Sequence, residues 1–120
     1  MNVNSLDIDG NGKPDALSDG LLILRSLFGL TDVALIQNAV APNANFKTAA
    51  ELQTRINNLG EFLDIDGNGA NDPLSDGLLI LRYLFGIRGE DLINDVVRDG
   101  ATRATAAEIE EYLAKMVPNL

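Results

Sequence analysis

A segment of 23 residues occurs twice in this chain, and the duplication limits the available folds more than any other feature. The two sequences are DIDGNGKPDALSDGLLILRSLFG at residues 7–29 and DIDGNGANDPLSDGLLILRYLFG at residues 64–86, and they differ at only four positions. The same offset of 57 residues aligns two later T-A-A-E sequences, which begin at Thr48 and Thr105. A repeat of this kind indicates a duplicated supersecondary unit. We predict a single domain of two repeats: residues 1–120, with repeat one at 6–62 and repeat two at 63–120.

The sequence predicts an all-α fold. No segment shows the sustained alternation of apolar and polar residues that is typical of a strand. The third predicted helix of each repeat begins with a Thr-x-x-Glu capping box. We expect the duplicated loop–helix units to pack with pseudo-twofold symmetry. The predicted helices are at residues 18–28, 32–40 and 48–59 in repeat one, and at residues 75–85, 90–97 and 105–116 in repeat two.

The first helix of each repeat is apolar around almost its whole circumference, interrupted mainly by Arg25 and Arg82. Because such a helix must be buried on most sides, we expect these two helices to pack on each other at the centre of the domain. Ser18 and Ser75 are the predicted N-caps, and Gly29 and Gly86 are predicted at the left-handed C′ position. Three roles remain open for the two arginines: anchoring an interface, capping a carbonyl, or pairing with an internal aspartate.

The loop before each of these helices places Asp or Asn at every second position, with glycine in the sixth place. Loops of the EF-hand type hold Ca²⁺ with side-chain oxygens at positions one, three and five, a backbone carbonyl at seven and an oxygen ligand at nine. Mg²⁺ fits less well, since it prefers fewer protein ligands. We therefore expect two Ca²⁺ ions, one in each loop. The predicted metal ligands are Asp7, Asp9, Asn11, Lys13 (backbone carbonyl), Asp15 and Asp19 in loop one, and Asp64, Asp66, Asn68, Ala70 (backbone carbonyl), Asp72 and Asp76 in loop two.

The residue that closes each loop differs from the EF-hand pattern. An EF-hand has a bidentate Glu at position twelve, but here that position is Ser18 or Ser75, and an acidic residue follows as Asp19 or Asp76. Asp is one methylene shorter than Glu, so a shift of one residue into the helix is geometrically reasonable. The sequence leaves open whether the serine or the aspartate closes each loop.

The motif D-I-D-G-N-G-x-x-D followed by a Leu-rich helix resembles the calcium loop and helix of dockerin-type repeats, which are relatives of the EF-hand. The resemblance covers residues 6–29 and 63–86. It implies a calcium-dependent module that binds cohesin domains on secreted bacterial assemblies, and hence an extracellular or cell-surface location. The chain differs from that family in the wider spacing of its two copies. It also differs at Pro14, which has no amide hydrogen for the backbone bonds that paired EF-type loops exchange.

Composition excludes several classes of function. The chain has neither Cys nor His, which excludes disulfides, zinc sites built on thiolate or imidazole, and Ser-His-Asp or Cys-His catalysis. A formal net charge of −9 opposes binding to nucleic acid and to anionic membranes. No apolar run is long enough to span a membrane. We expect the loop carboxylates to be committed to metal, which leaves no obvious free pair for glycoside hydrolysis, so we do not expect an enzyme.

The sequence thus predicts a non-catalytic, calcium-stabilised structural or interaction module of an extracellular bacterial protein, acting with a protein partner or by self-association. One alternative is a dockerin-like module with a cohesin-type partner, and another is a calcium-dependent filament or oligomer subunit. The filament or oligomer alternative arises because loop one has no helix before it and the last helix has no loop after it. If these ends meet within one chain the domain is closed, whereas contact between chains gives a head-to-tail homo-oligomer.

Overall fold

The computed structural model describes residues 5–117, and within that range the chain is all-helical, without a strand. The first four and last three residues of the predicted domain lie outside the described range. The radius of gyration is 13.3 Å, which is typical of a compact domain of about 100 residues. None of the helices in the described part is long and apolar enough to cross a membrane.

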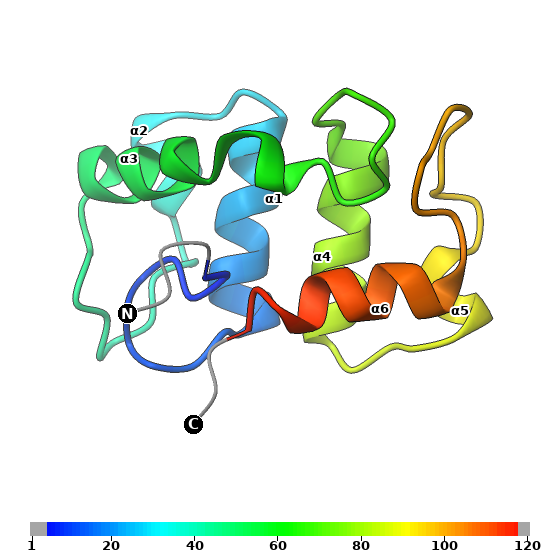
Figure 1. Ribbon diagram of the computed structural model, residues 1–120. Coiled ribbons are helices and arrows are strands. Elements are labelled where there is room, and N and C mark those ends of the chain that lie inside the picture. Colours follow the sequence, from blue (N-terminus) through cyan, green and yellow to red (C-terminus); the bar gives the residue numbers. More distant parts are fainter. Residues whose placement is uncertain (1–4, 118–120) are drawn as a thin grey trace.

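Helical elements of the same kinds follow one another in the two halves of the chain (Figure 1). A 3₁₀ helix, η2 (Gly60–Leu63), joins the halves. The others are η1 (Ala16–Gly20), α1 (Leu21–Leu27), α2 (Asp32–Ile36) and α3 (Ala49–Leu59), then η3 (Pro73–Gly77), α4 (Leu78–Leu84), α5 (Glu90–Ile93) and α6 (Ala106–Ala114).

The Leu-rich helices begin two residues earlier than predicted, because a π-helical turn precedes each α-helix. Their N-caps are Asp15 and Asp72, whose carboxylates accept hydrogen bonds of 3.2 and 2.9 Å from the amide two residues later. The prediction that Ser18 and Ser75 cap these helices was therefore wrong. Both serines already lie inside the helical turn, where their hydroxyl oxygens are buried without a hydrogen-bond partner among the described residues.

Helices α1 and α4 lie side by side at the centre of the molecule, as predicted (Figure 1). The glycines that directly precede the two helices, Gly20 and Gly77, allow this close approach. A Cβ atom on Gly20 would lie 2.9 Å from Leu81 Cδ1, and one on Gly77 would lie 2.6 Å from Leu24 Cδ1. Any larger side chain at either glycine would have to displace the facing leucine.

Burial of these two helices is less complete than their sequence predicted. The core contains fully buried residues from both, but Phe28 and Phe85, which follow directly, are 53% and 54% exposed. Each phenylalanine is followed by a glycine with positive φ, 89° at Gly29 and 92° at Gly86. The chain turns away there in the predicted C′ conformation, and about half of each phenylalanine stays exposed.

The second helices are shorter than predicted, with five residues in α2 and four in α5. Arginine side chains from the Leu-rich helices satisfy the carbonyls at their C-terminal ends. Arg25 Nη1 donates to the carbonyls of Leu35 at 3.1 Å and Gln37 at 2.7 Å, and Arg82 makes the corresponding bonds at the end of α5. Of the three roles that the sequence left open for these arginines, the structure shows carbonyl capping.

The long helices α3 and α6 begin with the predicted capping boxes, at Thr48 and Thr105. Helix α3 packs on α1 and α2, whereas α6 packs on α4 and α5 (Figure 1). Beyond α6, the carbonyl of Met116 accepts a 2.7 Å hydrogen bond from the amide of Leu6, at the start of loop one. The start of loop one and the segment after α6 therefore meet within one molecule.

Candidate metal centres

Each loop brings three carboxylates together. In loop one, oxygens of Asp7, Asp9 and Asp19 lie within 4.8 Å of one another, and all three residues are buried. In loop two the same holds for oxygens of Asp64, Asp66 and Asp76, of which the last two are buried. Carboxylate oxygens in such a group are the ligands that a hard divalent cation prefers.

The backbone of loop one wraps around its own side chains. Gly10 and Gly12 have φ values of 72° and 91°, which only glycine adopts readily. This curvature points amides inward: Gly12 N donates to Asp7 Oδ2 at 2.8 Å, and Asn11 N donates to Asp9 Oδ1 at 3.3 Å. Loop two is built in the same way, with a 2.8 Å bond from Gly69 N to Asp64 Oδ2. Residue spacing within the loop therefore decides where its carboxylates lie.

Aspartate rather than serine reaches back from each helix into the loop. Asp19 accepts from the amide of Asp9 at 3.1 Å and from that of Asp15 at 2.8 Å. Asp76 accepts from the equivalent amides of loop two, at 3.2 and 2.8 Å. Because the helix starts at residue 16, its first turn carries residue 19 toward the loop. Of the serine and the aspartate that the sequence left open for closing the loop, the aspartate matches the observed geometry.

The other predicted ligands lie around these groups. Asp15 and Asp72 stand outside the carboxylate groups and cap the helices instead. The Oδ1 atom of Asn11 accepts from the amide of Lys13 at 3.0 Å, and the same bond recurs at 3.1 Å between Asn68 and Ala70. Lys13 and Ala70, predicted to offer their carbonyls, are at the exposed outer turns of the loops.

Electrostatics inside both groups favour a bound cation. Burial raises the pKa of Asp19 to about 7 and that of Asp76 to about 6, with the neighbouring aspartates adding to the rise. Burial likewise raises the pKa of Asp9. Most telling is Asp7, because its Oδ1 atom is buried and has no hydrogen-bond partner among the described residues. An orphaned acceptor beside two further carboxylates fits a metal ion, whose charge would offset the cost of burial.

Two arginines that the sequence analysis missed hold the backbone of the loops. Arg55 donates from Nε to the carbonyl of Ile8 at 2.5 Å and from Nη2 to that of Asp7 at 3.0 Å. In loop two, Arg103 donates to the carbonyls of Ile65 and Asp64, both at 2.7 Å. These bonds fix the position from which the first carboxylate of each loop projects.

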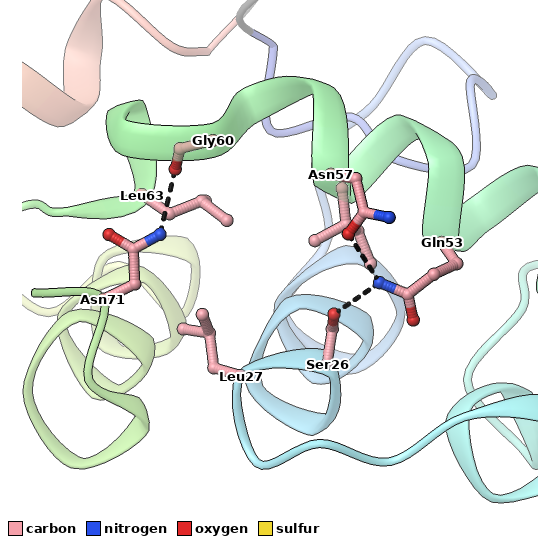
Figure 2. Close-up of a pocket in the computed structure, with 8 residues that line it drawn as sticks. Ser26, Leu27, Gln53, Asn57, Gly60, Leu63 and Asn71 are labelled. Carbon is pink, nitrogen blue, oxygen red and sulfur yellow. Dashed lines mark hydrogen bonds between the residues drawn. The ribbon is translucent and has the colours of Figure 1, made fainter.

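A separate cleft of about 440 Å³ lies between α1, α3, η2 and loop two. Figure 2 shows the side-chain amide of Gln53 bonded to Ser26 and Asn57, and that of Asn71 bonded to the carbonyl of Gly60. These bonds tie α3 to α1, and η2 to loop two. Among the described residues, no charged side chain lines the cleft, and none of the grouped carboxylates does. Its lining residues are Ser26, Leu27, Gln53, Ile56, Asn57, Gly60, Leu63 and Asn71.

No family model, curated protein or solved structure matches this chain. The resemblance to dockerin-type repeats therefore rests on the loop motif alone and stays a prediction.

Proposed function

We propose that this protein is a non-catalytic module stabilised by two Ca²⁺ ions, one in each loop. The observation that carries the proposal is the buried Oδ1 atom of Asp7, which has no hydrogen-bond partner among residues 5–117 and lies in a group of three carboxylates. A folded protein rarely leaves a buried acceptor unsatisfied, because its desolvation costs about 1–3 kcal/mol. A cation at this point satisfies that oxygen and offsets the mutual repulsion of the carboxylates.

Calcium is the metal that we propose because both loops offer only oxygen. Ca²⁺ accepts six to eight oxygen ligands in flexible geometry, whereas Mg²⁺ demands a strict octahedron and retains several waters. In this proposal the three grouped carboxylates of each loop bind the ion. The asparagine at position five, the carbonyl at seven and the aspartate at nine, directly or through water, complete the coordination.

The wider proposal is that the two loop–helix units are copies of one motif, packed with pseudo-twofold symmetry in the manner of dockerin-type repeats. An arginine–aromatic pair beside each loop (Arg55 over Phe46, Arg103 over Tyr112) and the facing glycines, Gly20 and Gly77, support this arrangement. We further propose an extracellular or cell-surface setting, where calcium is abundant enough for modules that bind it at about 10⁻⁴–10⁻³ M.

An interaction role is proposed for the apolar side chains that the fold leaves uncovered. Leu17 and Leu74, one just inside each Leu-rich helix, are 60% and 51% exposed. Exposed apolar side chains mark a partner site when they belong to a contiguous patch, and in this proposal a bound partner covers the two leucines. A cohesin-type protein remains the partner that the motif suggests.

Calorimetry with and without calcium tests the proposal. Calcium that binds the folded state alone stabilises it by RT ln(1 + [L]/Kd), which is about 2.7 kcal/mol at a hundredfold excess over Kd. Chelation should therefore lower the melting temperature, and re-addition of Ca²⁺ should restore it, with Mg²⁺ as the matched control. Equal melting temperatures in EDTA and in millimolar Ca²⁺ would contradict the proposal.

A further inference from the structure

The first carboxylates of the two loops lie in different surroundings despite their identical local sequences. Asp7 is 7% exposed, and its Oδ1 atom has no partner in the described part of the chain. Asp64 is more exposed, and its Oδ1 atom accepts a 3.2 Å hydrogen bond from the amide of Asn68. An ion in loop one therefore satisfies an oxygen that nothing else satisfies, whereas an ion in loop two shares an oxygen that already has a donor. Burial also strengthens the attraction between ion and carboxylate in loop one.

The carboxylates at position nine differ as well. In loop two, Asp72 uses Oδ1 to cap the helix, and Arg98 Nε lies 3.3 Å from its Oδ2. In loop one, Asp15 also caps the helix with Oδ1, but among the described residues nothing donates to its Oδ2. The position equivalent to Arg98 in repeat one is Ala41, which has no cationic side chain. Only in loop two does a protein cation compete for this carboxylate.

The backbone contacts at these two positions are alike, which isolates the effect of the side chain. The amide of Ala41 lies 3.4 Å from Asp9 Oδ2, and the amide of Arg98 lies 3.0 Å from Asp66 Oδ2. Replacing Arg98 with alanine keeps this amide and removes only the guanidinium. Loop one has a basic residue of its own, Lys13, but its exposed side chain forms no ion pair within the described range, and solvent and salt screen its charge.

We propose that the two calcium sites are unequal: loop one binds calcium more tightly, and Arg98 lowers the affinity of loop two by competing with the ion for the Asp72 carboxylate. This inference rests on the proposed function, in which each loop binds one ion. As calcium rises, loop one fills first. Loop two fills at a higher concentration, when the ion displaces Arg98 from Asp72.

Isothermal titration with CaCl₂ tests the inference when each loop is measured alone. Asp66→Asn disables loop two and reports on loop one, and Asp9→Asn does the reverse. We expect Asp66→Asn to bind its remaining ion about tenfold or more tightly than Asp9→Asn does, since charge and ligand supply set affinity in such loops. Adding Arg98→Ala to Asp9→Asn should raise the affinity of loop two roughly three- to tenfold.

Lys47→Ala in the Asp66→Asn background is the matched control for removal of a positive charge near loop one, because exposed Lys47 follows Phe46, whose amide donates to the carbonyl of Asp9. It should change the affinity of loop one by less than about twofold, because its charge is screened. Equal affinities of the two loops, or an affinity of loop two that Arg98→Ala leaves unchanged or lowers, would overturn the inference. A complete absence of calcium binding in the unmodified protein would instead contradict the proposed function.

Discussion

The guanidinium of Arg55 lies over the ring of Phe46, with Cζ 4.2 Å from the ring centroid. In repeat two the partners exchange places: Arg103 occupies the position of Phe46, and Tyr112 that of Arg55, with Cζ 3.9 Å from the ring centroid. Both guanidiniums nevertheless donate to the carbonyls of the first two residues of their own loop. Both repeats contain an arginine–aromatic pair, but they differ in which of the two equivalent positions carries the arginine.

This exchange predicts that repeat one tolerates the arrangement of repeat two. Arg55→Tyr alone should destabilise the calcium-loaded protein by about 1.5–3 kcal/mol, because it removes two charge-assisted hydrogen bonds to the loop. The double variant Phe46→Arg with Arg55→Tyr should regain more than half of that loss. Urea denaturation in excess calcium measures both. Additive losses in the double variant would show that the pair acts through some other contact.

Removal of Asp19 should weaken calcium binding, whereas removal of the Ser18 hydroxyl should not. Asp19→Asn takes a charge from the grouped carboxylates and should weaken calcium binding to loop one about tenfold or more. Ser18→Ala removes a buried hydroxyl that has no partner in the described part of the chain and should leave the affinity unchanged and the stability equal or slightly higher. Titration of both variants with calcium provides the test, and a larger loss of affinity in Ser18→Ala would reverse the assignment.

Without calcium, stability should fall as pH rises from about 5 to 7. The pKa of Asp19 is raised to about 7 and that of Asp76 to about 6, from an ordinary value of 3.8. The folded state therefore holds more protons than the unfolded state in this range, and the free energy of unfolding decreases with pH. The lowered pKa values of Glu51 and Glu108 act in the opposite direction, but that contribution is lost only as pH falls through their ordinary value of 4.5 and below.

Urea denaturation in EDTA at several pH values between 5 and 7.5 measures this dependence. Saturating calcium should reverse the slope, because the ion favours the ionised carboxylates and protons compete with it. The Asp19→Asn variant is the control, since it should flatten the slope in EDTA. A chelated protein whose stability rises steadily over this range would contradict the expected proton uptake on folding.

The contact between Leu6 and Met116 predicts a monomer. Loop one is joined to the C-terminal segment of its own chain, so a head-to-tail contact would have to displace an existing bond. Sedimentation velocity of the calcium-loaded protein should show one monomeric species over a wide range of concentration. A calcium-dependent dimer or filament would mean that this segment exchanges between molecules.

Features that depend on neighbours within about four residues were readable from the sequence. The capping boxes at Thr48 and Thr105 and the C′ glycines at Gly29 and Gly86 were predicted correctly. The predicted N-caps were wrong, because two side chains close together in the sequence could each cap the helix. Asp15, rather than Ser18, caps its helix, because the loop geometry lets the helix start two residues early.

The candidate site likewise combines local features that the sequence predicts with long-range contacts that it does not. The alternation of Asp and Asn around Gly12 directs carboxylates to a common point through bonds that span two to five residues. The arginine supports span 47 and 48 residues in repeat one, and spacing along the chain cannot predict them. Comparison of the two repeats offered a signal, since Phe46 and Arg55 exchange types together at positions 103 and 112.

The sequence by itself determined an all-α chain with two Asp-rich loops, because helix caps, glycine turns and inward-facing carboxylates follow from hydrogen bonds over short stretches of backbone. Only the tertiary structure decided that Asp7 is buried with an oxygen that has no partner among the described residues, that Arg98 pairs with Asp72, and that the segment after α6 returns to loop one. These relationships join residues far apart in the chain, so they depend on how α1 and α4 pack and on which side chains that packing removes from water.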